Sequence, residues 1–139
     1  MQAAQPHVLV VDDEPDIRRL LRTLLEYEGY AVGEASDGLD GLTQLHVSPY
    51  RLVVLLDYKM PHMNGAEMLD AVLADPELAS RHAIIFVTAN LLAFSPQLLQ
   101  MLQLAMIPVV QKPFRLEVIL GEIEHAIARL QSCTDTSAT

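Results

Sequence analysis

Residues 52–57 read LVVLLD, five consecutive apolar residues followed by an aspartate. A strand that is apolar without alternation is typical of the centre of a parallel sheet, where helices cover both faces. The runs HVLVV at 7–11 and AIIFV at 83–87 have the same character, and each is also followed by a polar residue. The stretch 52–57 therefore predicts a buried central strand that brings Asp57 to one edge of a sheet.

Helical patterns separate these apolar runs. Ile17, Leu20, Leu21 and Leu24 recur at the spacing of one helix face. In all, helices are expected at about 15–28, 39–45, 66–73, 96–105 and 116–130, and two further strands at 30–35 and 107–110. The third helix is expected to stop near Asp75-Pro76. Five strands alternating with five helices predict one α/β domain with a parallel sheet.

The composition limits the class of protein. A chain of 139 residues, 51% of them hydrophobic, fits one domain, expected over residues 1–130, with a substantial core. The net charge of −9 argues against direct binding to nucleic acid or to an anionic membrane. Cys133 is the single cysteine, so an intramolecular disulfide is excluded. The absence of a leader or long apolar run predicts a cytoplasmic protein, and the Ser/Thr-rich residues 131–139 a disordered tail or the start of a linker.

Polar residues follow the predicted strands at the end where parallel sheets bind ligands. Asp12 and Asp13 follow the first strand and Asp57 ends the third. Thr88 ends the fourth strand, and Lys112 follows the fifth. Three carboxylates at one edge would repel each other unless a cation held them, and Mg²⁺ takes such oxygen ligands. With a hydroxyl and a lysine for an incoming phosphate, the residues predict a Mg²⁺-dependent phosphoryl pocket. The five histidines have no metal-ligand spacing, and we interpret them as surface or incidental core residues.

Four motifs occur in order at these strand ends. They are VLVVDDEPD (8–16), LLDYKMPHMNG (55–65), FVTAN (86–90) and QKPF (111–114). With them the sequence resembles the receiver domain of two-component response regulators, from His7 to about Leu130. The resemblance implies a doubly wound, flavodoxin-like α/β fold with five helices and a five-stranded parallel sheet in the order 2-1-3-4-5.

The resemblance also implies roles for single residues. Asp57 would accept a phosphoryl group from a sensor histidine kinase, a phosphotransfer protein or a small phosphodonor. The implied Mg²⁺ site comprises Asp12, Asp13, Asp57 and the backbone carbonyl of Lys59, with Asp12 orienting the waters of the ion. Thr88 would move toward the phosphoryl group and Lys112 would form an ion pair with it. In this family the bond before Pro113 is usually cis.

The sequence departs from the family pattern near the fifth strand. Many receivers have an aromatic ring three residues before the lysine, where this chain has Val109. A valine cannot make the same rotamer change, so either the coupling is weaker or it runs through the loop after Thr88 instead. The segment 91–106 also carries more apolar residues than one buried helix face requires. This excess indicates either a larger core or an exposed apolar patch, on the face of 96–105, 107–110 and 116–130, that binds a downstream partner or a second copy of the chain.

Three functions remain in competition. The leading one is a phosphorylation-switched signalling domain with no dedicated small-molecule substrate. Nine residues follow Leu130, fewer than an output domain needs, so output by protein–protein contact or by onward phosphotransfer is expected unless the sequence is part of a longer chain. The second is a Mg²⁺-dependent phosphohydrolase of the haloacid dehalogenase type, but Asp12, Asp13 and Glu14 do not form its D-x-D motif. The third is a degenerate, phosphorylation-independent interaction module.

Overall fold

The computed structural model describes residues 7–138, with side chains described from 7 to 131. Within that range five parallel strands form one sheet in the order β2-β1-β3-β4-β5. The strands are β1 (His7–Val11), β2 (Ala31–Ala35), β3 (Leu52–Asp57), β4 (Ala83–Thr88) and β5 (Val109–Gln111). The predicted α/β fold class, the parallel sheet and its strand order are confirmed. Every residue of β3 is buried, as its unbroken apolar run predicted.

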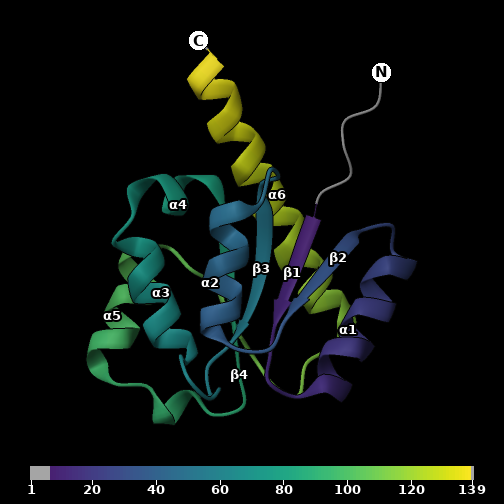
Figure 1. Cartoon of the computed structure of the whole chain (residues 1–139), viewed down its shortest axis with the longest axis vertical. Coiled ribbons are helices and arrows are strands. Elements are labelled where there is room, and N and C mark those ends of the chain that lie inside the picture. The colour runs from purple at the N-terminus through teal and green to yellow at the C-terminus, as the bar shows by residue number, and fades with distance from the viewer. Residues whose placement is uncertain (1–6, 139) are drawn as a thin grey trace.

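Helices cover both faces of the sheet (Figure 1). They are α1 (Pro15–Tyr27), α2 (Gly38–Val47), α3 (Gly65–Leu73), α4 (Pro76–Arg81), α5 (Pro96–Leu104) and α6 (Leu116–Ala138), with a 3₁₀ turn η1 (Leu91–Ala93). One core packs α1 and α6 against the sheet through Leu21, Leu25 and Ile123. The other packs α2, α3 and α5 through Leu45, Met68 and Leu102. The carboxyl ends of the strands, where the sequence predicted a site, lie between these two cores.

Local sequence signals set the helix ends. Asp37 caps α2 by accepting a hydrogen bond from the Asp40 amide at 2.8 Å. Ser95 caps α5 in the same way, with Pro96 as its first residue. Gly29, just past α1, has φ +98°, a conformation that glycine adopts without the penalty of a side chain. These ends agree with the predicted ones.

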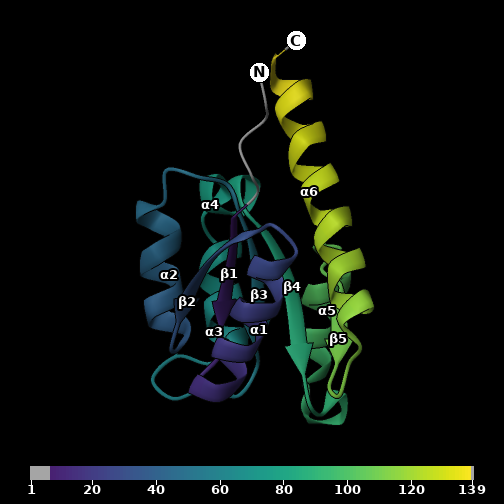
Figure 2. The ribbon, with the colours of Figure 1, turned by 90° about the vertical axis from the view of Figure 1, so that its right-hand side faces the viewer.

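The structure corrects three predictions about the elements. Asp75-Pro76 was expected only to stop α3, but Asp75 accepts hydrogen bonds from the amides of Glu77 and Leu78 and so opens α4, a sixth helix. The fifth strand starts at Val109 instead of Ile107, because the Ile107 amide donates to Leu102 and closes the end of α5. The last helix continues past Leu130 to Ala138, beyond the end of the sheet (Figure 2).

His82 lies buried at the junction of α2, α4 and β3. Its Nδ1 accepts a hydrogen bond from the Leu52 amide at 3.0 Å, and its Nε2 lies 3.2 Å from the carbonyl oxygen of Leu45. Both contacts are satisfied only by the neutral ring with its proton on Nε2. Burial lowers the pKa of His82 to about 4, well below its ordinary value. His82 is therefore a core residue with a structural role.

None of the described helices is both long enough and apolar enough to cross a membrane.

Candidate functional site

The predicted site residues meet at the carboxyl ends of the strands. Ligand oxygens of Asp12, Asp13 and Asp57 lie within 4.8 Å of one another. Asp12 and Asp57 are buried, whereas Asp13 is exposed at the rim. The pocket is also lined by Lys59, Thr88, Asn90 and Lys112. The structure therefore brings together all the residues that the strand-end pattern had singled out.

Asp12 is held in place through all its polar groups. Its amide donates to the Ala35 carbonyl at 3.1 Å, and its Oδ1 accepts from the Glu14 amide at 2.9 Å. Its Oδ2 faces Lys112 Nζ at 3.3 Å, and its backbone carbonyl accepts from Arg18 Nη1 at 2.7 Å. Asp12 is thus a fixed negative charge beside the Asp57 carboxylate.

Lys112 lies between two of the carboxylates. Its Nζ is 3.3 Å from Asp12 Oδ2 and 3.5 Å from Asp57 Oδ1. Burial by itself lowers the pKa of Lys112, but the charges of Asp57 and Asp12 outweigh it, so the pKa is raised and the ammonium stays charged. The peptide bond between Lys112 and Pro113 is cis, which confirms that expectation.

Asp57 stands at the end of β3 in a poorly hydrated position. Burial raises the pKa of Asp57 to about 6; Lys112 opposes this shift, and the charge of Asp12 adds to it. The Tyr58 amide donates to Asp57 Oδ1 at 2.9 Å. An acid that is costly to ionise in such surroundings is one that a bound cation would stabilise as the carboxylate.

The raised pKa of Asp57 has a measurable consequence for stability. The unfolded chain releases this proton near its ordinary pKa of 3.8 and the folded chain near 6, so folding stability is lost as pH rises between these values. We expect Asp57→Asn to be more stable than wild type by on the order of 2 kcal/mol above pH 7 without divalent metal. The difference should vanish near pH 4. Urea unfolding of wild type and variant at both pH values tests this, and a stability difference between them that is no larger at pH 7.5 than at pH 4 would contradict it.

The loop after β4 forms the opposite wall of the pocket. Thr88 is buried, and its Oγ1 accepts from the Asn90 amide at 3.2 Å. Asn90 in turn caps η1 through its own side chain, which accepts from the Leu92 amide. The Thr88 hydroxyl hydrogen remains available for an oxygen entering the pocket.

An aromatic cluster that no sequence motif indicated joins this loop to the end of β3. The Phe94 ring centre lies 4.8 Å from that of Tyr58 and 5.4 Å from that of Phe86. Tyr58 directly follows Asp57, so Phe94 links the loop after Thr88 to the end of β3. Val109, at the position of the family's aromatic switch, is only partly buried. The one available signal was Phe94 itself, an aromatic in a segment already marked as unusual.

The apolar excess of 91–106 divides between core and surface. Leu98 and Leu102 are buried, and Phe94 is buried beside them. The exposed large hydrophobic residues of the segment are Leu92 (95% exposed), Leu99 (43%), Leu104 (76%) and Met106 (75%). The segment therefore adds residues to the core and also leaves large apolar side chains exposed.

The comparisons with known proteins agree with this geometry. The family model of the response regulator receiver domain matches residues 8–124. The chain is 34% identical to the chemotaxis protein CheY of Pseudomonas aeruginosa, over 88% of this chain and 97% of that protein. It is 33% identical to the uncharacterized transcriptional regulatory protein YkoG of Bacillus subtilis, over 96% of this chain, but it spans only 56% of YkoG.

Solved structures give the same result. The response regulator protein TrrA of Thermotoga maritima, solved in complex with Mg(2+)-BeF, matches with a TM-score of 0.74 and 29% identity, over 88% of this chain and 99% of TrrA. Chemotaxis protein CheY4 of Vibrio cholerae matches with a TM-score of 0.74 and 28% identity, over 88% of this chain and 99% of CheY4. The fold, the five strand-end residues and these matches agree: the chain belongs to the response regulator receiver domain family of two-component signalling.

Proposed function

We propose that this receiver is switched by phosphorylation of Asp57, which takes a phosphoryl group from a sensor histidine kinase or a phosphotransfer protein. The observation that carries the proposal is the buried Asp57 carboxylate, with Asp12 and Asp13 oxygens within 4.8 Å and Lys112 at 3.5 Å. A lone surface carboxylate would have none of these neighbours. The protein is a signalling domain, and we assign it no small-molecule substrate.

The residues of the pocket fit Mg²⁺. Three carboxylates from two strand ends supply hard oxygen ligands, and one of them, Asp57, has a pKa raised by its surroundings. Asp12, Asp13 and Asp57 would hold the ion together with the backbone carbonyl of Lys59. When bound, it supplies positive charge that draws donor and acceptor oxygens together.

The remaining chemistry belongs to side chains of this chain. A carboxylate oxygen of Asp57 forms the new bond to phosphorus, and the bond from phosphorus to the donor nitrogen or oxygen breaks, with the electron pair leaving on the donor. Lys112 transfers its ion pair from Asp57 to an oxygen of the phosphoryl group. The Thr88 hydroxyl donates to another phosphoryl oxygen, which draws the loop toward the pocket.

The switched surface then signals by protein–protein contact. We assign this output to α5, β5 and α6, because Leu99, Leu104 and Met106 are exposed there. The occupant is a downstream protein or a second copy of the chain. We place the receiver at residues 1–130 and in the cytoplasm, with no direct contact to nucleic acid or membrane.

Treating the protein with acetyl phosphate and Mg²⁺ tests the proposal. We expect one added phosphoryl group by intact mass, labile to alkali and absent when EDTA replaces Mg²⁺. Continuous release of phosphate from small phosphate esters would support the phosphohydrolase instead. No adduct under any condition would leave the phosphorylation-independent module.

Two exposed residues at the mouth of the pocket should set the lifetime of the phosphorylated state. Lys59 and Asn90 both line the pocket at the side open to solvent. Their side chains flank the route of an attacking water, so we expect Lys59→Ala and Asn90→Ala to change the dephosphorylation rate by several-fold. The decay of purified phosphoprotein in MgCl₂, after the phosphodonor has been removed, measures that rate. Rates equal to wild type in both variants would contradict the prediction.

A further inference from the structure

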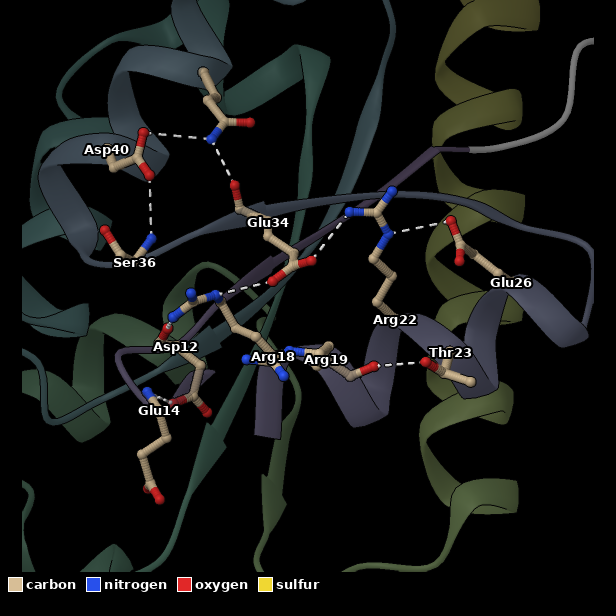
Figure 3. A network of polar contacts seen from close by, with 11 residues as sticks. Asp12, Glu14, Arg18, Arg19, Arg22, Thr23, Glu26, Glu34, Ser36 and Asp40 are labelled. Carbon is tan, nitrogen blue, oxygen red and sulfur yellow. Dashed lines mark hydrogen bonds and ion pairs between the residues drawn. The ribbon is translucent and has the colours of Figure 1, made fainter. Parts of the chain in front are cut away.

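A chain of polar contacts leads from β2 through α1 to the acidic pocket (Figure 3). Glu34 on β2 accepts from two arginines of α1: Arg18 Nε reaches its Oε1 at 3.1 Å, and Arg22 Nη1 reaches its Oε2 at 3.0 Å. Arg18 also donates through Nη1 to the backbone carbonyl of Asp12 at 2.7 Å. Arg18 is the member of this network that touches the pocket.

We propose that Arg18, held by Glu34, is a positioning residue that fixes the Asp12–Asp13 peptide and thereby sets the affinity of the pocket for Mg²⁺. The inference rests on the proposed function, because it concerns the same pocket. It adds a residue that neither coordinates Mg²⁺ nor accepts the phosphoryl group. Arg18 acts through the backbone of the residue that it holds.

The side chains of Asp12 and Asp13 are held differently, and this difference explains why the contact of Arg18 with the backbone matters. Asp12 has its side chain fixed by Glu14 and Lys112. Asp13 is exposed, and among the described residues no hydrogen bond or ion pair holds its side chain. The direction of Asp13 therefore depends on the peptide plane that precedes it. The oxygen of that plane is the Asp12 carbonyl, which Arg18 holds at 2.7 Å.

Glu34 fixes Arg18 in two ways. Its carboxylate anchors the Nε side of the guanidinium, so the Nη1 side remains aimed at Asp12, as Figure 3 shows. The negative charge of Glu34 also offsets the positive charge of Arg18, which would otherwise repel a cation in the pocket. Arg18 and Glu34 are both partly buried, with 17% and 24% of their side chains exposed, so water competes weakly for these bonds. The planar fork of arginine holds its N–H donors in a fixed geometry, whereas the three donors of a lysine ammonium sit on one compact atom at the end of a flexible stem.

Charge and position predict opposite effects of removing Arg18. If Arg18 acted only by its positive charge, Arg18→Ala would tighten Mg²⁺ binding. If it positions Asp13, the same change weakens binding. Arg22→Ala is the matched control, because it removes an equal charge from the same Glu34, whereas the hydrogen bonds of Arg22 go to Glu34 and Glu26 and not to Asp12.

The test titrates MgCl₂ into each purified protein and follows the amide NMR signals of Asp13, Tyr58 and Lys59. Disturbing the support of a metal ligand commonly costs tenfold or more in affinity, so we expect the Mg²⁺ Kd to rise about tenfold in Arg18→Ala. We expect Arg22→Ala to stay within about twofold of wild type. Arg18→Lys keeps the charge and most of the stem, and its Kd should rise by about threefold or more.

The outcomes separate this inference from the proposed function. A wild-type protein without saturable Mg²⁺ shifts at Asp13 would overturn both. A wild-type protein that binds Mg²⁺, with Arg18→Ala binding as tightly or more tightly, would overturn the positioning role alone. If Arg18→Ala does not fold, Arg18→Lys decides, and a wild-type Kd in that variant would overturn the inference. In metal-free Arg18→Ala the Asp13 amide signal should already be displaced, whereas in Arg22→Ala it should not.

Discussion

Gly65→Ala should destabilise the protein by about 3 kcal/mol, as expected when an atom is forced into a packed interior. Gly65 is the first residue of α3 and lies directly behind Asp57. A β-carbon on Gly65 would overlap the backbone oxygen of Asp57 and lie 2.9 Å from Phe86 Cζ and 3.0 Å from Tyr58 Cα. Two of these atoms are backbone and cannot rotate away. The strand end that carries Asp57 must move, so phosphorylation should slow as well.

Gly121→Ala is the matched control for Gly65→Ala. Gly121 lies in α6, and no atom stands within 4 Å of the position of its added β-carbon. Alanine is a better helix former than glycine, so this variant should be more stable than wild type by about 0.5–1 kcal/mol. Thermal unfolding of both variants measures the contrast. Equal melting temperatures would contradict the close packing behind Asp57.

His82→Ala should cost about 4 kcal/mol at pH 7.5. The change leaves the Leu52 amide and the Leu45 carbonyl without their partner in a buried place, and it opens a cavity. By comparison, His46→Ala removes an exposed side chain and should change stability by less than about 0.5 kcal/mol.

The cost of His82→Ala should also depend on pH. The unfolded chain takes up this proton near the ordinary pKa of 6.5 and the folded chain only near 4, so the contribution of His82 is complete above 6.5 and is lost as pH falls to about 4. That shift corresponds to about 3 kcal/mol. The difference between wild type and variant should therefore shrink to about 1 kcal/mol at pH 4. Urea unfolding across this range measures it, and a difference independent of pH would contradict the buried neutral ring.

Local sequence signals were enough to predict most of the fold. The unbroken apolar run of β3 and the alternation of strands with helices required the parallel sheet. The exceptions have physical causes. The helix α4 has six residues, too few for an apolar periodicity to show. The strand β5 starts later than predicted because the Ile107 amide donates to the Leu102 carbonyl at the end of α5. The hydrophobicity of the sequence does not indicate this hydrogen bond between residues five positions apart.

The residues of the site and its surroundings also fall into those that the sequence predicted and those that it did not. Asp57 and its four companions follow strands, so topology alone brought them together. Arg18 and Glu34 lie 16 residues apart on two elements, and their contact depends on how α1 packs beside β2. His82 gave no signal either, since its partners are the backbone groups of Leu52 and Leu45, 30 and 37 residues away. Contacts between a side chain and a distant backbone group leave no pattern in a sequence.

Locating the phosphorylated residue tests most directly whether Asp57 is the acceptor. The protein is phosphorylated with acetyl phosphate and Mg²⁺ and then treated with borohydride, which reduces an acyl phosphate of aspartate to homoserine. Peptide mass spectrometry then locates the reduced residue. We predict homoserine at position 57 alone, and none in Asp57→Asn or in wild type treated with EDTA. Homoserine at Asp12 or Asp13, or an equal yield of phosphoprotein from Asp57→Asn, would contradict the assignment of Asp57 as the acceptor.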